Sequence, residues 1–325
     1  MKTNNYMQEE IRDAALGLGF IDARPVTGHP FEVWRKRLSS IPLGQHMSFD
    51  HDPVAVSGWP LEEITLWAAV AETPPFEDWP EDCGEIGAYY MCSDERAKRD
   101  RAWEEAVVKM GYEIAYDFML PERAAAIRAG LGVHGLNGLL ITPDHGSFVS
   151  TSLLLIHAAP PPDARGPEHD LSPGCGNCGV CIKACPTGAI STDGVNTVIC
   201  LRTYMSHPEH MPEDDYSKMD KRILGCDTCQ HVCPKNNSVK RIKPSDDVTE
   251  STKIEKLLTD ASIEKMLQTT KIRHSSVNDV KRQAVLAAAN TGRKDLLPVI
   301  ESLAACEDKY ISKFARWASD SLMQG

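Results

Sequence analysis

Cysteine is the residue type in this sequence with the most distinctive chemical potential. Eight of the eleven cysteines lie between positions 175 and 233. Four of them follow the spacing C-x2-C-x2-C-x3-C-P from Cys175 to Cys185, and three more follow C-x2-C-x3-C-P from Cys226 to Cys233. Thiols at such spacings can form disulfides, bind zinc or bind iron–sulfur clusters.

Compartment and spacing separate these three alternatives. The first twenty residues lack the continuous apolar segment of a secretory signal, which predicts a cytoplasmic protein. Thiols stay reduced in that compartment, so disulfides are disfavoured. A zinc site uses two C-x2-C pairs and gives no reason for a Cys-Pro to end both motifs. The pattern therefore favours iron–sulfur chemistry of the bacterial ferredoxin type.

The number of cysteines matches two [4Fe–4S] clusters. The second motif is one ligand short, and the isolated Cys200 supplies the missing thiolate. In the ferredoxin arrangement the last cysteine of a run binds the other cluster. We therefore predict that the first cluster is bound by Cys175, Cys178, Cys181 and Cys233. The second cluster is then bound by Cys185, Cys200, Cys226 and Cys229. The remaining cysteines are interpreted as buried small apolar residues: Cys83, Cys92 and Cys306.

Residues 1–165 are expected to form an α/β domain in front of the cysteine segment. The apolar run 64–70 predicts a buried strand, and the amphipathic pattern of 95–111 predicts a helix. Further elements are predicted as helices over 7–19 and 120–132, a strand over 112–117 and a hairpin of 138–143 with 147–156. This order favours a partly antiparallel sheet flanked by helices, within an α+β fold class.

Two further units are expected after the α/β domain. The Pro- and Gly-rich stretch 158–174 marks a boundary, followed by a ferredoxin-like domain over 166–240. Residues 241–325 read as helical, and the sequence beginning at Val280 aligns with the one beginning at Ile311. Paired helices that repeat in this way predict a short HEAT-like region, although the usual HEAT period is about 40 residues or more. A plain helical subdomain is the alternative.

Charge is unevenly distributed along the chain. The formal net charge is −11, which argues against indiscriminate binding to polyanions. Residues 235–294 nevertheless hold 13 Lys and Arg against 7 Asp and Glu. An ordinary solvated face explains this excess, but any contact with nucleic acid must lie there.

Three stretches together resemble the epoxyqueuosine reductase (QueG) family. They are RAGLGVHGLNGLLITPDHGSFV at 128–149, the paired cysteine motifs with the isolated Cys200, and GCDTCQHVCPKN at 225–236. The resemblance covers about 110–292 and is weaker towards both ends. It implies a nitroreductase-like, cobalamin-binding α/β domain, two [4Fe–4S] clusters and C-terminal HEAT-like helices that help to hold tRNA.

The resemblance also implies a reaction. The family removes the epoxide oxygen of epoxyqueuosine in tRNA by a two-electron reduction, giving queuosine. Its clusters reduce base-off cobalamin to Co(I), which attacks the epoxide carbon, and an external donor of the flavodoxin or ferredoxin type supplies the electrons. The expected tRNA platform is a shared face of Lys281, Arg282, Arg293 and Lys294.

Site residues follow from the family's motifs. Asp117 matches the family's general acid, and a helix-capping or turn aspartate is the alternative. Two histidines, His134 and His145, flank the expected pocket, although a lone histidine is more often a satisfied core or surface residue. The cobalamin-binding residues implied by the resemblance are His134, Asn137, His145, Gly146 and Ser147.

Several pocket motifs depart from the family pattern. Asp117 is followed by Phe-Met instead of Thr-Gly, and Glu122 comes one residue early. The glycine-rich stretch 130–137 lacks an aromatic residue and a lysine, the amino-terminal motif is only echoed by 41–49, and 94–96 reads DER. The alternatives are therefore a related cobalamin-dependent reductase of a small molecule or halide, or an electron-transfer or corrinoid-handling protein.

Overall fold

The computed structural model describes residues 4–39, 50–170, 174–273 and 275–324. Its amino-terminal half is centred on an antiparallel sheet in the order β1 (Asp22–Thr27), β2 (Ile64–Glu72), β6 (Val149–His157). Trp67 of the central strand lies opposite Pro25 on one side and Leu154 on the other. Every β2 residue before Glu72 is buried, which confirms the strand predicted for 64–70.

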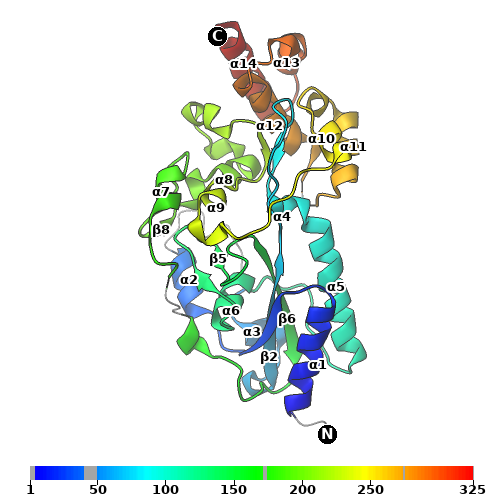
Figure 1. Ribbon diagram of the computed structural model, residues 1–325, viewed down its shortest axis with the longest axis vertical. Helices are drawn as coiled ribbons and strands as arrows, with labels where there is room; N and C mark the ends of the chain where they lie inside the picture. Colours follow the sequence, from blue (N-terminus) through cyan, green and yellow to red (C-terminus); the bar gives the residue numbers. More distant parts are fainter. Residues whose placement is uncertain (1–3, 40–49, 171–173, 274, 325) are drawn as a thin grey trace.

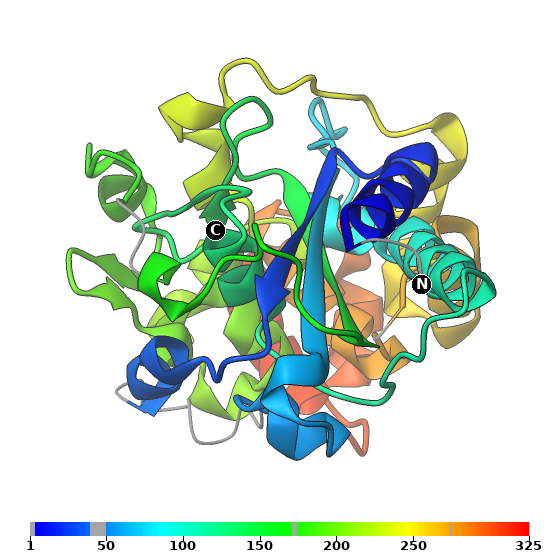
Figure 2. The same ribbon diagram turned by 90° about the horizontal axis from the view of Figure 1, so that it is seen from below.

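Helices cover both faces of this sheet. Leu66 and Ala68 share one core cluster with α6 (Glu122–Arg128), whereas Trp67 and Ala69 share another with α1 (Asn4–Gly17) and α5 (Ser93–Lys109). Successive strand residues face opposite sides, so one apolar run serves both layers. Figure 2 shows α1 and α5 together on one side of the strands. The helices predicted at 7–19, 95–111 and 120–132 are thus confirmed, with shifted ends.

The predicted hairpin is wrong in its pairing. β5 (Leu140–Ile141) pairs with β4 (Val133–His134). Between the two segments of the predicted hairpin, the structure has an isolated bridge from Thr142 to Gly146. The predicted strand at 112–117 is likewise reduced to an isolated bridge between Ile114 and Ile156. Its end cannot stay extended, because Asp117 has a φ of 55°.

The cysteine-rich segment is made of short elements. Its helices and strands are α7 (Val180–Ala184), β7 (Ile190–Ser191), β8 (Gly194–Val195), α8 (Leu201–Ser206), β9 (Arg222–Leu224) and α9 (Thr228–His231). The helices of the C-terminal part are α10 (Asp246–Ser251), α11 (Asp260–Thr270), α12 (Val277–Asn290), α13 (Leu297–Leu303) and α14 (Lys309–Gln324). Figure 1 places these last helices at the end of the molecule opposite the amino terminus.

The remaining elements are α2 (Glu32–Ser39), α3 (Pro53–Ser57), β3 (Glu85–Ile86) and α4 (Ala88–Met91). Side chains of α2 and α3 pack against the core cluster of β2 and α6. β3 pairs in parallel with β9, and Cys83 forms a bridge with Lys253. The segment around β3 therefore packs with the carboxy-terminal half although it precedes residue 165. The domain limits 1–165, 166–240 and 241–325 stay a prediction.

The C-terminal helices pack around small residues. Ala284, Ala287 and Ala288 of α12 are fully buried in the same cluster as Phe314 and Ala318 of α14. The two segments aligned by sequence are therefore neighbours in space, while the HEAT-like description stays a prediction. Among the described residues, no helix is long and apolar enough to span a membrane.

Candidate functional site

The first cysteine motif forms a tight loop in front of α7. Gly176, Asn177 and Gly179 all have positive φ, at 90°, 53° and 73°. Glycine adopts this left-handed conformation without the steric cost of a Cβ. The loop can thus turn repeatedly between Cys175 and Cys181 and present its thiols to a common centre.

Cys233, from the second motif, joins this first loop. Burial raises the pKa of the Cys181 thiol, and nearby Cys175 and Cys233 raise it further. The pKa of Cys233 is raised by burial and then by Cys178 and Cys175. The chain therefore places four thiols of two separate motifs close enough to interact.

The other four cysteines form a second group. The pKa of Cys200 is raised by its burial and by the neighbouring thiols of Cys226 and Cys185. Burial also raises the pKa of Cys229, with further contributions from Cys226 and Cys200. These neighbours are those expected from the crossed arrangement, in which Cys185 leaves its own motif to join the isolated Cys200.

The spacing of the sulfur atoms bears on the type of metal site. A zinc ion with Zn–S bonds of about 2.3 Å holds its sulfurs about 3.8 Å apart. Among the described residues, no three cysteine sulfurs lie within 4.8 Å of one another. All eleven cysteines are free thiols. The donor set therefore suits a cluster that spreads its ligands over several iron atoms.

The three cysteines outside these groups differ from one another. Cys83 is buried and donates from Sγ to the carbonyl of Thr249, and burial raises its pKa to about 11. That residue confirms the prediction of a buried thiol. Cys92 and Cys306 are only half-buried.

A buried hydrogen-bond network ties the second cysteine motif to the α/β half. The Asn236 side chain accepts from the Ser147 amide at 2.7 Å and donates to the Gln230 carbonyl at 2.7 Å. Gln230 in turn donates to Asp227, which accepts from the amide of Ala88 at the start of α4. This Asn236 network fixes the motif at two points, the Ser147 amide and the Ala88 amide. Its three polar side chains in the motif GCDTCQHVCPKN are those of Asp227, Gln230 and Asn236.

A cavity of about 260 Å³ lies between the α/β half and the first cysteine loop. Its wall is formed by α2, α6, the β4 region and the β7–β8 hairpin, with Asn177 from the cysteine loop. Trp34 Nε1 and His134 Nε2 are buried there and have no hydrogen-bond partner among the described residues. Burial and the charges of Arg37 and Arg123 lower the pKa of His134 to about 4. The cavity therefore presents unsatisfied polar groups and a neutral imidazole at pH 7.

The five predicted cobalamin-binding residues do not all face this cavity. His134 lines it, and Asn137 lies beside the thiol of Cys229. His145 pairs with Glu72 at 2.6 Å, and Ser147 belongs to the Asn236 network. A Cβ on Gly146 would lie 1.9 Å from Asn236 Oδ1, so this glycine allows close approach of the two halves.

Two cavity residues were missed by the sequence reasoning. Trp34 and Arg37 come from α2, which carries no motif of its own. Their only sequence signal is the apolar and basic pattern of an ordinary helix. The stretch 41–49, which echoes a family motif, lies outside the described residues.

Asp117 lies on an exposed turn before α6. Its φ of 55° is in the left-handed region, which is uncommon for a residue with a side chain. Pro121, not Asp117, is the N-cap of α6, so the capping alternative is wrong. The neighbouring Met119 amide donates to Asp50 at 3.0 Å, which fixes this turn.

A charged network lies behind this turn. Arg96 makes two hydrogen bonds to the Glu122 carboxylate, at 2.9 and 2.7 Å, and Thr151 donates to the same group. Burial raises the pKa of Glu122, while Arg96 acts in the opposite direction. The change to DER at 94–96 thus provides the ion-pair partner of Glu122.

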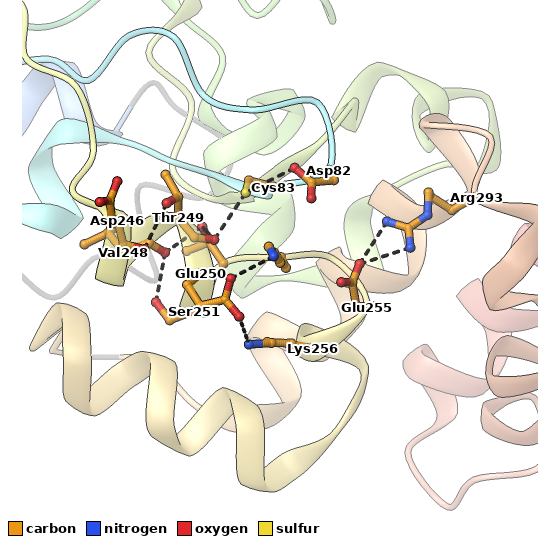
Figure 3. Close-up of polar contacts among 12 residues, drawn as sticks. Asp82, Cys83, Asp246, Val248, Thr249, Glu250, Ser251, Glu255, Lys256 and Arg293 are labelled. Atoms are coloured by element: carbon orange, nitrogen blue, oxygen red, sulfur yellow. Dashed lines mark hydrogen bonds and ion pairs between the residues drawn. The ribbon is translucent and has the colours of Figure 1, made fainter.

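The basic residues of the expected tRNA platform are largely compensated. Lys281 and Arg282 are buried and pair with Asp260 and Asp279 respectively. Arg293 pairs with Glu255 at 3.0 Å and Asp295 at 2.7 Å, whereas Lys294 is exposed. Figure 3 shows Arg293 facing Glu255 and Lys256 facing Glu250 in the same region. These residues do not form one free basic face.

The cysteine-rich segment is similar in sequence to known proteins. Residues 174–236 match the family described as a 4Fe-4S double cluster binding domain. An epoxyqueuosine reductase of Listeria monocytogenes is 42% identical over 119 residues, which cover 36% of this chain. They cover 30% of that relative, so the match spans less than two thirds of its length.

Solved structures extend the likeness over the whole fold. An epoxyqueuosine reductase with a tRNA-Tyr epoxyqueuosine-modified stem loop has a TM-score of 0.79 at 22% identity. That of Bacillus subtilis, with its aspartate catalytic loop swung out of the active site, has a TM-score of 0.79 at 21% identity. Both matches cover 98% of this chain and 91% of the other. This chain is therefore related in sequence to the epoxyqueuosine reductase family and shares the fold of its solved members.

Proposed function

We propose that this protein is a cobalamin-dependent iron–sulfur reductase that converts epoxyqueuosine in tRNA to queuosine. The observation that carries the proposal is the crossed grouping of eight free thiols beside a cavity with unsatisfied polar groups. The proposed reaction is that of the relatives, which are epoxyqueuosine reductases. Overall, an epoxide gains two electrons and two protons, its oxygen leaves as water and an alkene remains.

The two clusters are assigned to the two thiol groups. One cluster is held by Cys175, Cys178, Cys181 and Cys233. The other cluster is held by Cys185, Cys200, Cys226 and Cys229. Burial and mutual proximity raise the pKa of several of these thiols, so the groups need a positive partner to become thiolates. Iron supplies that partner, which is why the residues fit the clusters.

The cavity residues fit part of a cobalamin. Trp34 Nε1 offers an N–H donor, and neutral His134 offers either a donor or an acceptor for amide and phosphate groups of the cofactor. The cavity is smaller than a whole corrinoid, so we assign it to a peripheral part of the cofactor. When bound, cobalamin supplies a strong metal nucleophile and the clusters supply single electrons.

Asp117 is the proposed general acid. Its exposed turn allows the carboxyl group to meet a bulky substrate, and its left-handed backbone is a strained conformation of the kind found at active sites. Its role is to protonate the departing epoxide oxygen and later the hydroxyl that leaves as water. The Arg96–Glu122 pair fixes the first turn of α6, which follows the Asp117 turn.

A related reductase of a small molecule is the second candidate. The observation that favours it is the pairing of Lys281, Arg282 and Arg293 with acids, because paired cations release few counterions from tRNA. Under this candidate the clusters and cobalamin are kept, and the substrate differs.

Three measurements on anaerobically reconstituted protein test these proposals in order. Iron analysis is expected to give about eight irons per chain, and about four would contradict the two-cluster assignment. A titration with cobalamin is expected to give a base-off visible spectrum, and no spectral change would exclude both candidates. Turnover of epoxyqueuosine-containing tRNA with a strong reductant then separates them, since only the first candidate forms queuosine.

A further inference from the structure

Three ligand-type side chains meet on the surface just beyond α8. The donor atoms of His207, Glu209 and His210 all lie within 4.8 Å of one another. His207 Nδ1 is 3.2 Å from Glu209 Oε1, and His210 Nε2 is 4.0 Å from the same oxygen. The imidazole rings are 6.0 Å apart, so both converge on one carboxylate.

The backbone holds these side chains in place. His207 donates its amide to Thr203 in α8 at 2.8 Å, and the His210 amide donates to the His207 carbonyl at 3.1 Å. Pro208 begins the short 3-10 helix Pro208–His210 with a restricted φ. Pro208 and Met211 are both buried, and they alternate with the exposed donors. The backbone therefore has little conformational entropy left to lose when a ligand binds.

The donor set indicates a class of ligand. Two imidazole nitrogens and one carboxylate oxygen are the protein ligands of many zinc sites, and they suit other borderline divalent transition metals. All three side chains are exposed, which leaves room for water to complete the coordination.

We propose that His207, Glu209 and His210 form a site for a divalent transition-metal ion of the zinc type, separate from the eight cysteines. The ion ties the end of α8 to the 3-10 helix that follows. α8 begins directly after Cys200 and spans about 9 Å at 1.5 Å per residue. Metal binding thus stiffens the short segment that leads from the Cys200 thiol to the surface.

The test uses protein with both iron–sulfur clusters already in place, so that the thiols do not compete for zinc. Zn²⁺ is titrated against a chromogenic indicator, and Co²⁺ serves as a spectroscopic probe of the same site. We expect one extra ion per chain, with His207→Ala and His210→Ala each weakening Zn²⁺ binding at least about tenfold. The Co²⁺ ligand-field bands are expected to disappear in both variants.

His169→Ala is the matched control. His169 is exposed and lies 3.3 Å from Glu168, so it is also a surface His–Glu pair, but no second histidine is grouped with it in the described structure. This variant is expected to bind Zn²⁺ as the wild type does. Equal Zn²⁺ affinity of the wild type and His207→Ala, or an equal loss in His169→Ala, overturns the proposal. Iron content and circular dichroism check that each variant remains folded.

Discussion

The cysteine loops concentrate thiols and the C-terminal helices concentrate basic side chains, but only the basic side chains are paired with groups of opposite charge. Thiols of the two cysteine groups lie together, and burial and their neighbours raise the pKa of members of each group. On the C-terminal side, Lys281, Arg282 and Arg293 each lie against an acidic side chain. Concentrated groups that nothing compensates need a ligand, whereas compensated groups stabilise the fold itself.

Like the cysteine loops, the cavity contains polar groups that are not compensated by neighbouring side chains. Trp34 and His134 bury polar atoms that have no partner among the described residues, at a cost that a bound ligand can offset. The Asn236 network behaves like the C-terminal helices, since its polar atoms satisfy one another. Function is therefore expected where groups lack partners, and stability where they have them.

Loss of a cluster thiol is expected to have the largest effect. Cys200→Ser should lower the iron content from about eight to about four per chain and abolish reductase activity, because a cubane needs all four of its thiolates. Iron analysis and electron paramagnetic resonance measure the outcome. Cys306→Ser is the control, and its iron content should stay at about eight. Full iron in Cys200→Ser would remove this residue from the cluster.

Removal of the proposed acid comes next. Asp117→Asn should lower turnover about 10²- to 10⁴-fold, the usual contribution of a general acid. Iron content and cobalamin affinity should not change, because Asp117 lies outside the cysteine loops and the cavity. Asp144→Asn, in another exposed turn, is the control and should keep its activity. Unchanged turnover in Asp117→Asn would assign the acid to another group.

Breaking the compensated Asn236 network should cost stability. Asn236→Ala leaves the Ser147 amide buried without a partner, which is expected to lower the free energy of unfolding by about 2–3 kcal/mol. Denaturant unfolding of the reconstituted protein measures this value. The adjacent Asn237 is exposed, so Asn237→Ala should stay within about 0.5 kcal/mol of the wild type. Equal stability of the two variants contradicts a structural role for the network.

The uncompensated cavity histidine should make stability depend on pH. The pKa of His134 is about 4 in the folded protein and about 6.5 when unfolded, so the unfolded state binds the proton first as the pH falls. Its contribution is constant above about pH 6.5 and makes stability fall towards pH 4. The fall is about 2 kcal/mol, which allows for solvent screening of the partly exposed ring. Comparing the unfolding free energy of the wild type and His134→Gln across this range isolates the effect. An identical pH profile for both proteins would rule it out.

The smallest effect is expected at the paired basic residues. Arg293→Gln should change tRNA affinity less than about twofold and leave its salt dependence unchanged, because Arg293 is already neutralised by two carboxylates. Binding titrations at several salt concentrations measure both quantities. A tenfold loss of affinity would show that tRNA displaces these acids, and it would place this region in the tRNA interface.

The cysteine pattern and the buried strand were accessible from the sequence because both are local. The ligand spacing of an iron–sulfur loop is written in consecutive residues, and the apolar run 64–70 is long enough to identify β2. The pairing of β5 was predicted wrongly, since two-residue strands carry little periodic signal and their partner is chosen by packing. The cavity residues of α2 have no motif at all.

By itself, the sequence determined that thiols occur in two iron–sulfur motifs, and it predicts that Cys200 completes the set of ligands. Only the tertiary structure decided which charges are compensated. Asp260 pairs with Lys281 from another helix, and Asn236 accepts from Ser147 of the α/β half. His134 Nε2 has no partner among the described residues. The physical reason is that Coulomb and hydrogen-bond energies depend on distance in space, which the order of residues along the chain does not specify.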